Sequence, residues 1–110
     1  MGSGEWAQST ALDERLPGAL RLEAVLQALS DPVRLGIVVQ LDRQGESTCA
    51  ALDGGRPKST MSHHFRVLRE AGLVQTRIQG VTHRNTLCRD SLEAAFPGLL
   101  GVILAAAPKD

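Results

Sequence analysis

The chain has 110 residues, in which 12 lysines and arginines balance 12 aspartates and glutamates, so its formal net charge is zero. This length is enough for one domain with a modest hydrophobic core. Trp6, Phe65 and Phe96 are the only large aromatic residues, which favours aliphatic helix packing over an aromatic-rich sandwich. Cys49 and Cys88 are too few for a disulfide scaffold, and no secretory segment is recognised, so we expect a cytoplasmic protein.

The neutral total hides an uneven distribution of charge along the chain. Residues 1–55 hold four basic and eight acidic residues (−4), and residues 90–110 hold one basic and three acidic residues (−2). Between them, residues 56–89 hold seven basic residues and one acid, Glu70 (+6), together with all three histidines. Such a concentrated basic segment indicates a face for a polyanion, although a charge run is also compatible with an ordinary solvated surface.

The first half of the chain predicts two helices. Residues 1–16 show no clear pattern and are expected to form a flexible arm. Apolar residues recur at helical spacing over 19–29. Ser30-Asp31-Pro32 is typical of the start of the next helix, because a capping side chain precedes a proline whose missing N–H costs nothing there. Gly45 is expected to end that helix.

A helix-turn-helix follows. Residues 47–52 are expected to form a short helix, with Ser or Thr available to cap it. The glycine-containing stretch 53–57 predicts a turn. The next helix covers 58–71, and Met61, Phe65 and Leu68 share one face because they are spaced at i, i+4 and i+7.

The last third predicts a hairpin and one more helix. Residues 74–78 and 82–87 have strand character, and Gly80 lies between them. A single final helix is expected from Ser91 onward. The uncharged stretch 94–108 is too short and too interrupted by Pro and Gly to span a membrane, so we interpret it as a buried interface helix. The predicted fold is mainly α, a winged helix-turn-helix (α-α-α-α-β-β-α) over 17–107, with a tail at 108–110.

The helix at 58–71 carries the chemistry that best identifies a function. If its apolar face points inward, short donors, an imidazole and a guanidinium point outward, and no acid precedes Glu70. Hydroxyls, His and Arg reach base edges or phosphates in a major groove, and a helix N-terminus favours phosphate. The residues predicted to contact DNA in this helix are Lys58, Ser59, Thr60, Ser62, His63 and Arg66. An ordinary amphipathic helix with a polar outer face is the alternative.

The hairpin supports the same interpretation. No acidic residue occurs from Val74 to Arg89, and a cationic hairpin tip is able to lie along phosphates or enter a minor groove. The residues predicted to contact DNA in the hairpin are Arg77, Gln79, Thr82, His83 and Arg84. A plain solvated hairpin is the alternative.

These segments resemble the ArsR-type winged-helix repressors. The stretch 30–38 is similar to the start of that family's second helix, 58–74 to its recognition helix, 77–84 to its wing, and 96–100 to a last-helix segment of some members. The resemblance implies a homodimer that binds a two-fold DNA operator and leaves it when a signal arrives. It implies dimerisation through the first and last helices, whose apolar positions are Leu22, Val25, Leu26, Leu92, Phe96, Leu99, Leu100 and Ile103.

The metal sites common in that family have no counterpart in this sequence. The two thiolate positions of its Cys-x-Cys pair correspond to Thr48 and Ala50, so Cys49 is expected to be a small core residue. No histidine follows His83, so the last-helix site is absent as well. His63 and His64 point about 100° apart on a helix and do not converge on one ion. We expect His63 to face DNA and His64 to pack against the domain, with no metal and no cofactor.

Four other functions fit the sequence less well. A thiol switch using Cys49 and Cys88 is an open alternative, since the effector is unknown. A winged helix used only for protein interaction should tolerate acids or large apolar residues on the outer face, and single-stranded RNA binding favours exposed aromatic residues; the sequence has neither pattern. No nucleophile constellation or phosphate loop indicates an enzyme.

Overall fold

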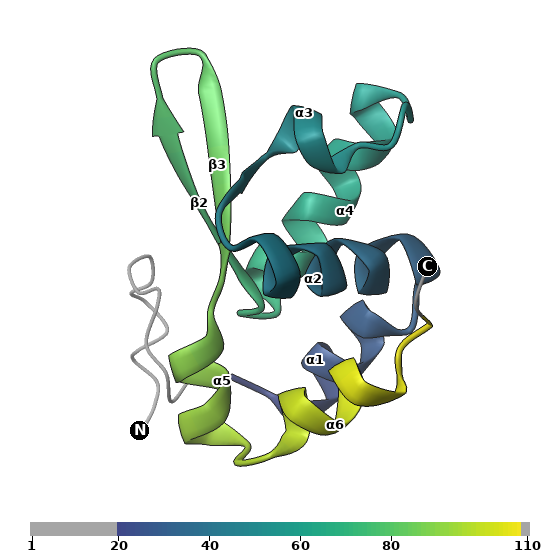
Figure 1. The fold of residues 1–110 in the computed structure, drawn as a ribbon, viewed down its shortest axis with the longest axis vertical. Helices are drawn as coiled ribbons and strands as arrows, with labels where there is room; N and C mark the ends of the chain where they lie inside the picture. The colour runs from purple at the N-terminus through teal and green to yellow at the C-terminus, as the bar shows by residue number, and fades with distance from the viewer. Residues whose placement is uncertain (1–19, 109–110) are drawn as a thin grey trace, which may run out of the picture.

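The computed structural model describes residues 20–108, so the arm expected at 1–16 and the last two residues of the expected tail lie outside the described part. A helical body carries a long β-hairpin that projects from it (Figure 1). The elements in chain order are α1 (Leu22–Leu29), α2 (Pro32–Gln44), β1 (Ser47–Thr48), α3 (Cys49–Leu52), α4 (Lys58–Glu70), β2 (Val74–Gln79), β3 (Thr82–Leu87), α5 (Arg89–Ala95) and α6 (Leu99–Ala106).

Helix α4 lies across the core as its spacing predicts. Met61, Phe65 and Leu68 are at most 3% exposed, and they place α4 against α1, α2 and β2. Leu73, which follows the helix, is fully buried. Burying this stripe removes apolar surface from water, the dominant favourable term in folding. The opposite face of α4 is therefore left to solvent.

The start and end of α2 confirm the sequence signals. Asp31 is the N-cap, and its Oδ1 accepts hydrogen bonds from the N–H groups of Val33 (2.8 Å) and Arg34 (3.2 Å). Burial, the largest single influence, raises the pKa of Asp31. The two N–H donors and the charge of Arg34 outweigh it and hold that pKa below its ordinary value. Gly45 ends the helix as expected.

The segment expected to be one short helix contains a strand as well. Ser47 and Thr48 form β1, which pairs antiparallel with β3 through Ser47↔Asn85 and Thr48↔Arg84, so the sheet order is β1-β3-β2. Only the remaining four residues form α3, and the Thr48 hydroxyl accepts a hydrogen bond from the N–H of Ala51 to cap it. The prediction was wrong at Ser47 because its partner residue in β3, Asn85, is distant in sequence and leaves no local signal.

The final helix is also different from the expectation, because it is broken in two. Phe96 leaves the helical region (φ −136°, ψ 77°), as a residue before proline tends to do, and Pro97 lacks the N–H that would continue the helix. Gly98 then takes a left-handed φ of +84°, which reverses the chain before α6. Within residues 20–108 no helix is long and apolar enough to cross a membrane.

Candidate nucleic-acid interface

The outer face of α4 presents the predicted side chains to solvent. Its N-cap, Pro57, makes no side-chain hydrogen bond to the helix, so the N–H groups of the first turn are left without a side-chain cap. The exposed side chains of this face are Lys58, Ser59, Thr60, Ser62, His63 and Arg66. One helix therefore offers an ammonium, hydroxyls, an imidazole, a guanidinium and open N–H groups on the same surface.

The two adjacent histidines have different environments, as predicted. His63 is exposed, whereas His64 is half-buried, and its Nδ1 lies 3.1 Å from Nη1 of Arg34. A guanidinium only donates, so Nδ1 accepts and the proton of the neutral ring is on Nε2. The same Arg34 donates from Nε to the carbonyl of Ala28 at 2.7 Å. Arg34 thus ties α4 to α2 and to the end of α1, a role that no local pattern in the sequence indicates.

The side chains predicted for the hairpin divide between its two faces. Directly opposite residues of an antiparallel pair lie on one side of the sheet. The register pairs Arg77 with Arg84 and Gln79 with Thr82 on one face, and Ile78 with His83 on the other. The hairpin therefore contributes two surfaces rather than the single cluster that the sequence suggested.

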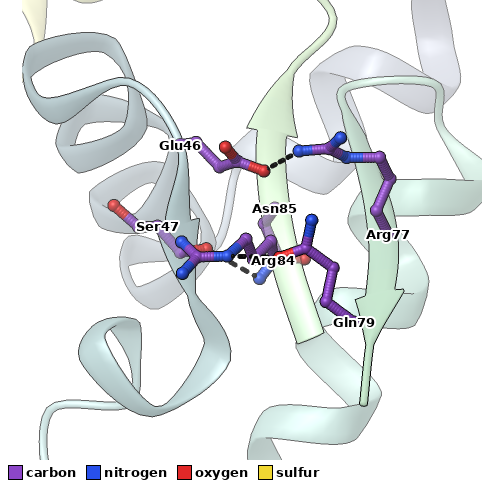
Figure 2. Close-up of polar contacts among 6 residues, drawn as sticks. All are labelled: Glu46, Ser47, Arg77, Gln79, Arg84 and Asn85. Atoms are coloured by element: carbon purple, nitrogen blue, oxygen red, sulfur yellow. Dashed lines mark hydrogen bonds and ion pairs between the residues drawn. The ribbon is translucent and has the colours of Figure 1, made fainter. Parts of the chain in front are cut away.

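The two opposed arginines have intramolecular partners (Figure 2). Arg77 forms an ion pair with Glu46, and Nε of Arg84 donates to Oε1 of Gln79 at 2.8 Å. Like charges directly opposite each other destabilise a sheet, and Glu46 offsets this repulsion. Solvent reaches both arginines, since the Arg77 side chain is 55% exposed and Arg84 is partly exposed.

A fully buried asparagine fixes the hairpin to the rest of the domain. Asn85 Oδ1 accepts a hydrogen bond from the Thr76 hydroxyl at 2.6 Å. Its Nδ2 lies 3.4 Å from the carbonyl of Ser47 and 3.2 Å from Sγ of Cys49. One side chain therefore joins β2, β1 and α3. The sequence-based prediction did not include Asn85, although a polar residue inside an alternating strand was the available signal.

Both thiols are free and half-buried. Cys49 packs against the core, and its Sγ accepts a hydrogen bond from Nδ2 of Asn85. Both contacts agree with the expectation that Cys49 is a small core residue. Burial raises the pKa of the Cys88 thiol above its ordinary value. Residues 20–108 hold no group of three or more His, Cys, Asp or Glu side chains placed to hold a metal ion.

The residues predicted for dimerisation are divided by the structure. Val25, Leu92 and Leu100 are at most 5% exposed within the protomer itself. Phe96, Leu99 and Ile103 are partly buried beside them. By contrast, Leu22 and Leu26 of α1 are 44% and 46% exposed. Val102 of α6, which was not predicted, is 68% exposed. Residues of α1 and α6 line one small cavity, and both helices lie at the end of the body away from the hairpin tip (Figure 1).

Comparison with known proteins agrees with this geometry. A family described as "Helix-turn-helix domain" matches residues 29–77. YceK of Bacillus subtilis, named as an HTH-type transcriptional regulator, is 37% identical over 79 residues, which cover 69% of this chain and 79% of YceK. The arsenical resistance operon repressor of Escherichia coli is 43% identical over 60 residues, covering 51% of this chain and 50% of that repressor.

Solved structures show the same arrangement. The solution structure of Mb0332 from Mycobacterium bovis, described as a homodimeric winged helix-turn-helix DNA-binding domain and a possible ArsR-family regulator, has a TM-score of 0.61 at 27% identity and covers 76% of this chain and 77% of that one. The transcriptional repressor BigR from Xylella fastidiosa has a TM-score of 0.55 at 31% identity, covering 67% and 84%. These relatives are named as regulators rather than enzymes. With its cationic hairpin beside a helix face that holds no acid before Glu70, the chain belongs to the ArsR-type family of winged helix-turn-helix DNA-binding transcriptional repressors.

Proposed function

We propose that two copies of the chain bind one two-fold DNA operator, each placing α4 in a major groove and its hairpin on the flanking backbone. The observation that carries this proposal is the outer face of α4: six polar or cationic side chains are exposed there, and no acid precedes Glu70. A helix of this width fits the major groove of B-DNA, and a dimer spaces its half-sites about one turn, roughly 10 base pairs, apart. A dimer seated on a promoter excludes polymerase, so the proposed activity is repression by a cytoplasmic protein.

The proposed roles follow from the chemistry of each group. His63 and Arg66 read base edges, because their side chains reach further from the exposed face than those of the hydroxyl residues. Lys58 and the open N–H groups of the first turn hold phosphates. The remaining proposed contacts are to phosphate and sugar, from Ser59, Thr60, Ser62, Arg77, Gln79, Thr82, His83 and Arg84. Arg34, through His64, keeps α4 at the angle these contacts require.

The proposed dimer contact is the exposed apolar surface of α1 and α6. Leu22, Leu26 and Val102 are the large side chains that a partner would cover. The buried members of the predicted set, such as Val25 and Leu92, belong to the core of the protomer and are not proposed to contact the partner. The homodimeric state of the Mycobacterium bovis relative supports the proposal.

Selection of bound duplexes from random DNA tests the operator. We expect a two-fold consensus. His63→Ala should relax base preference at one position at a cost of about 1–3 kcal/mol. Arg84→Ala should weaken all duplexes about equally and reduce the salt slope by about one. Arg43→Ala, which removes the same charge from α2, is the matched control and should change neither quantity.

Light scattering tests the dimer. The purified protein should have the mass of two chains, and Leu26→Glu should yield a folded monomer because it places a charge in the proposed contact. The proposal is wrong if purified, folded protein ignores every duplex at low ionic strength. A wild-type protein that stays monomeric while bound to an asymmetric site would overturn the two-fold part alone.

A further inference from the structure

A cavity lies between the hairpin tip and the helices α3 and α4. Its volume is about 420 Å³, which falls within the range of small-molecule sites. Met61 and Phe65 of α4 form its floor, and Ala50 of α3 forms part of one wall. Met61 and Phe65 are core residues held in place by packing, whereas exposed side chains form much of the wall, so the cavity is an open groove with a fixed base.

The walls of this cavity combine apolar and cationic groups. Lys58, at the start of α4, and His83, on β3, line it from different elements. Lys58 takes part in no ion pair with another of residues 20–108. Asp53 is the acid that lines the cavity, and its Oδ1 is engaged by the N–H of Gly55 at 2.8 Å. An ammonium and an imidazole are therefore available above an apolar floor.

We propose that this cavity is a binding site for a small organic anion with an apolar body, such as an aromatic carboxylate or sulfonate. The apolar body would lie against Ala50 and Val81, above the buried Met61 and Phe65, and the anionic group would pair with Lys58 and accept a hydrogen bond from His83. Burial of the body supplies most of the affinity, while the charged pair fixes orientation.

Such a ligand acts on the DNA-binding surface directly. Lys58 and His83 are two of the residues proposed above to contact DNA, so an anion that occupies them competes with phosphate. The ligand also fills the space between α4 and the hairpin, the two elements that must engage the duplex together. Occupation of the cavity would therefore make the protein release DNA. This regulatory role rests on the proposed function, whereas the binding of the ligand does not depend on it.

Titration of the whole protein with 1-anilinonaphthalene-8-sulfonate tests the site, because this probe joins an apolar ring system to a sulfonate. Calorimetry should give one saturable site per chain. Ala50→Trp, which fills the cavity from α3, should abolish that site. Ala51→Trp is the matched control, since Ala51 is the next residue, is also exposed, and does not line the cavity. Lys58→Gln, on the exposed surface, should weaken binding about tenfold through loss of the charged pair.

The variants distinguish binding in this cavity from binding elsewhere on the protein. Equal binding by Ala50→Trp and Ala51→Trp, with circular dichroism showing both folded, overturns the proposal. If Ala50→Trp does not fold, unchanged binding by Lys58→Gln overturns it instead. The proposal is also overturned if Leu26→Glu loses probe binding while the cavity variants keep it, because the probe would then occupy the apolar surface of α1.

The regulatory role is tested by adding the probe to a complex with the selected duplex. Release of the duplex by wild type but not by Ala50→Trp supports it. A protein that binds the probe at this cavity yet binds no duplex would leave the ligand site standing and remove the proposed DNA function. A protein that binds duplex but not the probe would overturn the ligand site and leave the proposed DNA function standing.

Discussion

Replacement of Asn85 by alanine should destabilise the domain strongly. Asn85 is fully buried, and its Oδ1 accepts a hydrogen bond from the Thr76 hydroxyl at 2.6 Å. The variant leaves that hydroxyl without its partner, and it removes the weaker contacts to the Ser47 carbonyl at 3.4 Å and to Cys49 Sγ at 3.2 Å. A buried polar group left unsatisfied costs about 1–3 kcal/mol.

We therefore expect Asn85→Ala to lower the free energy of unfolding by about 2–4 kcal/mol, because one strong contact and two weak ones disappear together. That is a large part of the roughly 5–15 kcal/mol available to a domain. Urea unfolding followed by far-ultraviolet circular dichroism measures the change. Gln75→Ala, exposed on the neighbouring strand, is the control and should stay within about 0.5 kcal/mol of wild type.

A double-mutant cycle identifies the cause. Thr76→Val removes the hydroxyl while keeping the shape of the side chain, so the double variant should lose less than the sum of the single variants by at least about 0.5 kcal/mol. Strict additivity, or a loss below about 1 kcal/mol in Asn85→Ala, would refute the reasoning that this amide anchors the hairpin.

Three further measurements test local features. Asp31→Ala should lose about 1 kcal/mol at neutral pH through its missing cap. Burial raises the pKa of Asp31, but hydrogen bonds from backbone N–H groups lower it overall, so this stabilisation is present above the ordinary carboxyl pKa and disappears as pH falls through the lowered value; Asp31→Asn should keep the cap and lose that part of the acid dependence of Tm. Gly98→Ala should destabilise by about 1–2 kcal/mol because φ is +84° there, whereas Gly101→Ala, in open space within α6, should stabilise by about 0.4–1 kcal/mol; equal effects in urea unfolding would contradict the left-handed turn. Burial raises the pKa of Cys88, so its alkylation by iodoacetamide in a Cys49→Ser protein should require higher pH than that of a free thiol, and an unshifted pH–rate profile would show the thiol to be solvated.

Local sequence patterns determined the elements that bear the function. The spacing of Met61, Phe65 and Leu68 predicted both the existence of α4 and its buried side, and with it the exposed side that faces the proposed DNA. Asp31-Pro32 indicated the start of α2, and Gly80 indicated the turn of the hairpin. Each of these signals acts within a few residues, because helix periodicity, capping and positive φ depend on neighbours in the chain.

Only the tertiary structure decided which side chains are paired, covered or left free. Ser47 lies in a strand because it pairs with β3, and Arg77 forms an ion pair with Glu46, 31 residues away in sequence. Of the neighbouring apolar residues of α1, Val25 is buried and Leu26 remains exposed, and Val25 lies beside residues of α5 and α6, which follow it by more than 60 residues. The physical reason is that burial and cross-strand pairing are set by residues distant in sequence, whose positions no local pattern contains.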